Sequence, residues 1–142
     1  MIEYITINET PKNSAIQYKL SKNYGYIGLA NISLCGLTFK AGNYSIVKVV
    51  VEEIDKTADN PNRVIASLLL SKDKYYFYEK EYGNIQWQKF DSTGKQLNIK
   101  FYDEDGELYE FKYKQFNKVT GYDQIQITFA LLPENTKWIA KL

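Results

Sequence analysis

LNIKFYDEDGELYEFKY, residues 97–113, consists of two alternating runs joined by an acidic turn. A two-residue loop in this turn would set core-type residues opposite charged ones, and a three-residue loop over residues 104–106 removes that conflict. Gly106 then takes the left-handed position of a bulge, where glycine carries no steric penalty. The register predicts a central hairpin with Leu97, Ile99 and Phe101 opposite Tyr113, Phe111 and Tyr109, and with Lys100 and Asn98 opposite Glu110 and Lys112.

Other segments carry the same strand-like pattern. Residues 44–54 are the most β-prone, with three valines on one face, and residues 63–70 follow as their hairpin partner across the polar loop 55–62. Residues 123–132 alternate strictly, and Pro133 ends the run. The alternation also predicts that Ile85 and Trp87 join the face of Phe101 as a third strand of the central hairpin.

Three glycines, Gly25, Gly28 and Gly36, interrupt the apolar run 24–39. Glycine inside strand-like sequence indicates a bulge, a bend or a close approach of backbone. The alternative is a phosphate-binding loop, but the spacing matches neither the Walker nor the dinucleotide pattern. No segment has helical periodicity with caps.

These patterns predict an all-β protein: a single antiparallel β-sandwich, jelly-roll-like, of about eight to ten short strands. The 142 residues suit one domain, with residues 1–14 as an edge strand or an N-terminal arm and residues 133–142 as a C-terminal tail. The N-terminus lacks a signal-peptide pattern, and no apolar stretch has the length of a membrane span, so we expect no membrane partner.

The amino-acid composition limits the reactions and ligands that we expect for this chain. Histidine is absent, which removes the usual general base and the commonest metal ligand. Cys35 is the only cysteine, so it forms no internal disulfide, and we interpret it as a buried thiol. The net charge is +1 and Arg63 is the only arginine, which argues against a nucleic-acid partner. We expect no cofactor and no metal.

Acidic residues offer two alternatives to a purely structural role. The turn 103–107 resembles a calcium loop in composition, but it lacks the ligand spacing of an EF-hand. A solvated bulged turn is favoured, because the three-residue loop already explains Gly106. Glycosidase chemistry needs only two carboxylates, yet no pair stands out among Glu52, Glu53, Glu79, Glu81 and Glu110. We therefore expect no catalytic residues and no enzyme activity.

Aromatic residues are the most suggestive feature: 13 Tyr, 7 Phe and 2 Trp exceed what a core of this size needs. If Phe77 and Tyr75 point inward, the other tyrosines of residues 75–82 form an exposed row, which suits glycan or protein contact. The alternative is a strand covered on both faces. The candidate binding residues are Tyr76, Tyr78, Tyr82, Trp87 and Trp138.

YIGLANIS at residues 26–33, and LNIKF at 97–101 followed by DEDGEL at 103–108, are similar to segments of small β-sandwich proteins of virions. The chain thus resembles jelly-roll capsid, head-fibre or decoration subunits of double-stranded DNA viruses and tailed phages. The resemblance implies a structural role without catalysis, located in a virion or in the host cytoplasm, and assembly with other virion proteins.

We therefore expect a structural subunit that forms a homo-oligomer such as a trimer. The alternatives are a carbohydrate-binding or receptor-binding module that uses the exposed aromatic residues, with a glycan as its partner, and a small glycosidase. Three features favour assembly, because large exposed apolar patches are uncommon on monomers. They are the aromatic residues on both faces of residues 75–82, an N-terminal segment without obvious core anchors, and Trp138 and Ile139 in the C-terminal tail. The alternative is that the termini fold back and complete the sandwich of a monomer.

Overall fold

The structure is a computed structural model that describes residues 2–9, 15–34, 37–38, 44–71, 76–79, 84–109, 112–113 and 125–134. It is all-β, and the described ranges contain no α-helix. The strands are β1 Glu3–Glu9, β2 Ala15–Lys19, β3 Tyr26–Leu34, β4 Leu37–Thr38, β5 Tyr44–Val51, β6 Val64–Ser71, β7 Tyr76–Glu79, β8 Gln88–Lys89, β9 Gln96–Tyr102, β10 Lys112–Tyr113 and β11 Ile125–Leu132.

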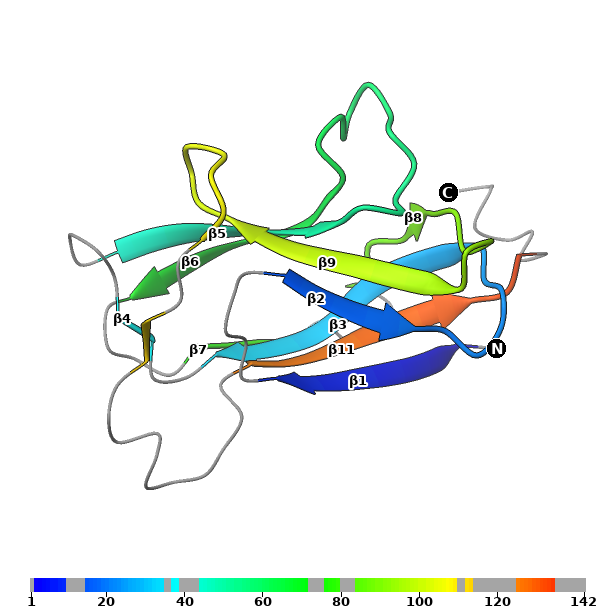
Figure 1. Cartoon of the computed structure of the whole chain (residues 1–142), viewed down its shortest axis with the longest axis horizontal. Helices are drawn as coiled ribbons and strands as arrows, with labels where there is room; N and C mark the ends of the chain where they lie inside the picture. Colours follow the sequence, from blue (N-terminus) through cyan, green and yellow to red (C-terminus); the bar gives the residue numbers. More distant parts are fainter. Residues whose placement is uncertain are drawn as a thin grey trace.

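Nine of these strands form two antiparallel sheets that pack face to face (Figure 1). The lower sheet in the figure has the order β1-β11-β3-β7, with β8 also paired to β3, and the upper sheet has the order β2-β9-β5-β6. In each sheet, a strand from near the N-terminus lies beside a strand from the later part of the chain, and the other two strands come from nearer the middle of the chain. This is the strand order of a jelly roll, and it confirms the fold class expected from the sequence.

The core lies between the sheets and follows the period-two pattern. Val47, Val49 and Val51 of β5 are fully buried, as predicted. β11 contributes four more buried side chains of the inward row, and β5 pairs with β6 across the polar loop. Burying these apolar rows, at about 25 cal/mol per Å² removed from water, is the main force that holds the sheets together.

The predicted central hairpin is correct only next to its turn. Tyr102 bridges Leu108, and the Tyr109 N–H donates to the Phe101 carbonyl at 2.8 Å, which is the expected three-residue-loop register. Beyond Tyr109 the prediction is wrong, because β2 occupies the place beside β9 and pairs Tyr18 with Leu97, while β10 pairs with β4. Residues 110 and 111 lie outside the described ranges.

The predicted third strand of that hairpin is also wrong. β8 pairs with β3 of the opposite sheet. Ile85 and Trp87 pack with Ala30 and Ala130 in a small apolar cluster outside the main core. Ala130 points outward as its alternation predicts, yet it is fully buried because this cluster covers it.

Two glycines behave as their sequence context predicts. A Cβ at Gly28 would lie 2.3 Å from Ile85 Cγ2 and 3.1 Å from the Gln86 carbonyl oxygen, and one at Gly25 would lie 2.8 Å from the Glu134 Cα. Both positions are close backbone approaches, so neither belongs to a phosphate loop. Gly36 and Cys35 lie outside the described residues.

The N-terminal segment is an edge strand over Glu3–Glu9. It pairs with β11 along its whole length, and Ile7 enters the core. The first residue of this strand forms an ion pair with Lys22, whose Nζ donates a hydrogen bond to Glu3 Oε1 at 2.7 Å. The C-terminal tail is described only to residue 134, which places Trp138 outside the described residues.

Candidate functional site

A groove crosses the outer face of the β2-β9-β5-β6 sheet between two projecting turns. Figure 1 shows both turns rising from the upper sheet: the connection between β5 and β6, and the acidic turn after β9. The hollow between them has a volume of about 690 Å³. Its lining residues are Lys48, Val50, Glu52, Glu53, Lys56, Pro61, Asn62, Arg63, Val64, Tyr102 and Gly106.

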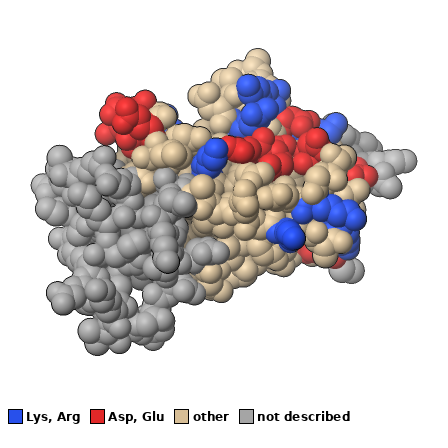
Figure 2. All heavy atoms as spheres, in the orientation of Figure 1, with Lys and Arg blue, Asp and Glu red and all other residues tan. Residues whose placement is uncertain are grey.

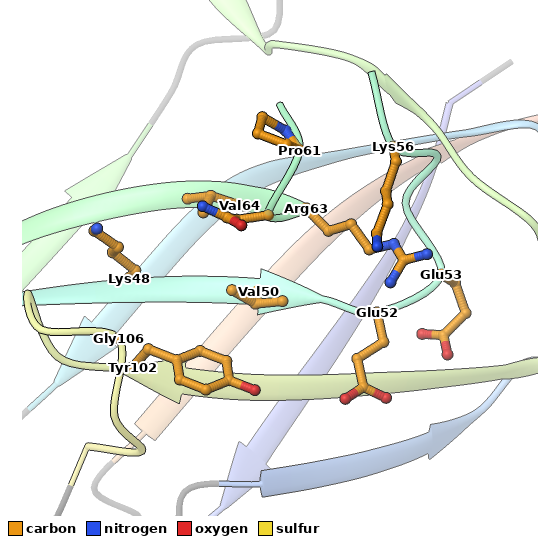
Figure 3. Close-up of a pocket in the computed structure, with 11 residues that line it drawn as sticks. Lys48, Val50, Glu52, Glu53, Lys56, Pro61, Arg63, Val64, Tyr102 and Gly106 are labelled. Carbon is orange, nitrogen blue, oxygen red and sulfur yellow. The ribbon is translucent and has the colours of Figure 1, made fainter. Parts of the chain in front are cut away.

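The floor of the groove follows from the alternation of β5. Because the odd-numbered valines face the core, Lys48 and Val50 face outward. The register sets Val50 between Lys100 and Val64, and it sets Lys48 opposite Tyr102. Directly opposite residues share a face, so an apolar patch and an aromatic ring form the floor beside Lys48 (Figure 3).

The wall at residues 52–63 is a closely hydrogen-bonded loop. Asn60 holds it shut, because its Nδ2 donates to the Val64 carbonyl and its Oδ1 accepts from the Val64 N–H, both at 2.9 Å. Arg63 Nε donates to the Ile54 carbonyl at 3.0 Å, and Arg63 has a φ of 59°. The loop therefore presents Arg63 in a fixed place at the groove.

The opposite wall is the acidic turn. Asp103 Oδ1 accepts from the backbone N–H groups of Asp105 and Glu107, at 2.9 and 3.0 Å. Gly106 has a φ of 83°, which confirms the predicted bulged turn. The side chains of Glu104, Asp105 and Glu107 are exposed, and Gly106 is the residue of the turn that lines the groove.

Both carboxylates in the groove already have partners. Glu52 Oε1 lies 2.6 Å from Lys100 Nζ, and this hydrogen bond raises the pKa of Lys100. Glu53 accepts from the Asn98 N–H and from Asn98 Nδ2, each at 2.7 Å. Through these contacts each carboxylate joins the turn after β5 to β9.

The cations in the groove are differently placed. Among the residues that the structure describes, Lys48, Lys56 and Arg63 form no ion pair. In Figure 3, Lys56 and Arg63 extend into the same end of the hollow, and Lys48 stands toward the other end. A neighbouring hollow shares Glu52, Glu53, Lys56 and Arg63 and adds Asp55 and Asp91, so four carboxylates and two cations line it. Figure 2 shows Asp and Glu side chains gathered beside Lys and Arg side chains on this view of the molecule.

The outer face of the opposite sheet, β1-β11-β3-β7, differs from the groove in its charge. Three rows cross β1, β11 and β3, and they contain no Lys, Arg, Asp or Glu. We call this surface the neutral face; its rows are Tyr4–Ala130–Gly28, Thr6–Thr128–Asn31 and Asn8–Gln126–Ser33. Ala130 and Gly28 are buried beneath the cluster of Ile85 and Trp87, so the first row is open to solvent only at Tyr4. Thr6 and Thr128 share a hydrogen bond of 3.0 Å between their hydroxyls, and the side chain of Tyr4 is 52% exposed.

The residues predicted to bind a ligand are not brought into one described site. Trp87 is half-buried in the apolar cluster beside the neutral face. Tyr76 and Tyr78 lie on β7, where the register pairs them with Leu34 and Ile32 of β3, and their side chains lie outside the described part of the structure. Tyr82 and Trp138 lie wholly outside it.

Sequence reasoning missed the groove. Lys48, Lys56, Arg63 and Tyr102 come from one strand, one loop and the end of another strand, and no spacing links them. One signal was present: the only arginine of the chain lies where a polar loop enters an apolar strand. Within the described ranges, no group of three or more His, Cys, Asp or Glu residues is arranged to hold a metal ion.

No protein-family model matches the chain, and no curated protein matches it at a significant level. In the part of the chain that the structure describes, no helix has the length and apolar character needed to cross a membrane.

Proposed function

We propose that the chain is a non-enzymatic structural subunit of a virus or phage particle that acts through protein–protein assembly. The observation that carries this proposal is the strand order, β1-β11-β3-β7 against β2-β9-β5-β6, since viral capsid subunits are built on the jelly roll. Lectin domains and cupins share the architecture, so the fold alone does not separate these functions.

The neutral face supports assembly over the other roles of the fold. The cores of protein interfaces are depleted of charged residues and enriched in Tyr and Trp. The neutral face shares the first of these features, because its rows lack charged residues, and Tyr4 is its one aromatic residue. It ends at β1, an edge strand with neither Pro nor Lys to block pairing. A second copy of the chain is its partner in this proposal, because two uncharged faces meet without desolvating an unpaired charge.

Sedimentation velocity over a concentration series tests this proposal. The intact chain should be a homo-oligomer such as a trimer, and Thr6→Lys should shift it toward monomer by setting a charge in the neutral face. Gln17→Lys is the matched control, because Gln17 is an exposed position on the edge strand of the other sheet. A chain that stays monomeric at every concentration, and that binds no other protein of a virion, would rule the proposal out.

A second candidate function is a carbohydrate-binding or receptor-binding module. The groove favours it, because a concave surface with an aromatic ring and a few convergent polar groups is the usual form of a ligand site. Glycan-array screening of the intact chain tests this candidate separately from its oligomeric state. Signal on a defined set of glycans supports it, and a blank array argues against it.

A further inference from the structure

We propose that the groove on the β2-β9-β5-β6 sheet binds an acidic saccharide, with its carboxylate or sulfate between Lys56 and Arg63 and a sugar ring over Val50 and Tyr102. This inference goes beyond an assembly role and rests on the second candidate function, for which it names the site and the ligand class.

The balance of charge in the groove favours an anionic ligand. Five charged side chains line the groove: three cations and two carboxylates. Glu52 is paired with Lys100 at 2.6 Å, and Glu53 accepts two hydrogen bonds of 2.7 Å from Asn98. The carboxylates are therefore occupied, while the cations form no ion pair within the described residues. The three cations are therefore available to bind an anion.

Two of these cations lie close together. Lys56 and Arg63 belong to one loop and reach the same end of the groove (Figure 3). Asn60 and the Arg63 Nε bond hold the loop, so the guanidinium is presented without a large loss of freedom on binding. Charge-assisted hydrogen bonds from Arg and Lys are the strong contacts for carboxylate and sulfate oxygens.

The remaining lining residues favour a saccharide over a simple inorganic anion. Val50, Val64 and Tyr102 give a partly apolar floor, on which the C–H face of a sugar ring finds contact. The acidic turn follows Tyr102 directly and lines the groove through Gly106, and the negative charge of its exposed Glu104, Asp105 and Glu107 repels a second anionic group at this end. This polarity sets the ligand's direction: its acid at the Lys56 end and its neutral ring at the Tyr102 end.

An acidic peptide segment is the competing ligand. It would carry negative charge along its length, toward both the acidic turn and the hollow that Asp55 and Asp91 line. A saccharide with one acidic group keeps its charge away from the acidic turn and brings a single anion to the edge of that hollow, where Lys56 and Arg63 lie. For this reason the observations favour the saccharide.

Nuclear magnetic resonance titration of the intact chain tests the inference. The probes are sialyllactose, a sulfated heparin disaccharide, lactose and a glutamate hexapeptide. At least one acidic sugar should bind about tenfold more tightly than lactose, move the amide signals of residues 50, 56, 63 and 102, and weaken as salt is raised. Equal binding of lactose, tighter binding of the peptide at these residues, or binding of neither acidic sugar would overturn the inference.

Two variants locate the site. Lys56→Gln should weaken binding of the acidic sugar by about tenfold and leave lactose binding unchanged, and Tyr102→Leu should weaken both. Lys19→Gln, an exposed lysine on β2 that does not line the groove, is the matched control. Thr6→Lys should leave sugar binding intact while Lys56→Gln leaves the sedimentation unchanged, so failure of the site and failure of the assembly proposal are distinguishable.

Discussion

Glu53 and Asn98 are joined by two hydrogen bonds of 2.7 Å, from the backbone N–H and from Nδ2 of Asn98 to the two carboxylate oxygens. They fasten the turn after β5 to the middle of β9, next to the point where the Glu52 N–H donates to the Asn98 carbonyl at 3.0 Å. The floor and one wall of the groove are thereby held in fixed relation.

Glu53→Gln should destabilise the protein by about 1–3 kcal/mol, because it replaces one accepting oxygen with a donor that faces another donor. Chemical denaturation followed by tryptophan fluorescence measures this. Glu52→Gln is the neighbouring control, and it should change stability little, because the Glu52–Lys100 pair is solvent-exposed and screened. Equal effects of the two substitutions would contradict the role given to Asn98.

Phe101→Ala should cost about 3–5 kcal/mol of unfolding free energy, because the ring is fully buried between the sheets and its loss leaves a cavity. The adjacent Lys100→Ala tests the assignment of faces, since Lys100 points to solvent on the outer face. Thermal or denaturant unfolding of both variants is the measurement. A Lys100→Ala cost as large as that of Phe101→Ala would show that the two faces of β9 are misassigned.

Gly28→Ala should destabilise by about 1–3 kcal/mol, the usual cost of overpacking. The added Cβ would lie 2.3 Å from Ile85 Cγ2, so the segment at residues 84–87 must move outward. Gly94→Ala is the control, because a Cβ there meets nothing within 4 Å and should be tolerated. Trp87 fluorescence reports the displacement, and an unchanged spectrum and midpoint for Gly28→Ala would argue against this packing.

The attachment of β1 should depend on pH. The hydrogen bond from Lys22 lowers the pKa of Glu3 below its usual 4.5. A lowered pKa in the folded state adds stability that is present above the unfolded pKa and is lost as pH falls through the folded value. Amide exchange across residues 3–9 should therefore accelerate relative to β9 as pH falls below about 4.5, after correction for intrinsic rates.

Glu3→Gln is the control for this pH effect. The variant lacks the titrating carboxylate, so its β1 should exchange faster than wild type near neutral pH and should show little further change on acidification. The opposite result, a wild-type β1 that stays equally protected through the acid range, would mean that the Lys22 contact does not hold the strand.

The sequence by itself determined which side of β5, β9 and β11 faces the core. Period-two alternation placed Val49 and Ile127 inward, and the turn at Gly106 set the register of Phe101 against Tyr109. These features are local, because the alternation and the turn each lie within a few residues of chain. They sufficed to predict an antiparallel, jelly-roll-like β-sandwich, but not the order of its strands.

Only the tertiary structure decided which strand lies beside which. Any strand whose apolar residues alternate with polar ones can pair with β9 and face the core. In the structure β2 lies beside β9, where the second strand of the central hairpin was predicted to lie. The groove arose in the same way, since Lys56, Arg63 and Tyr102 meet through two turns that share no pattern. Alternation records the side of a sheet that a residue faces, whereas neighbours are selected by packing between segments far apart in the chain, and the local sequence does not encode that choice.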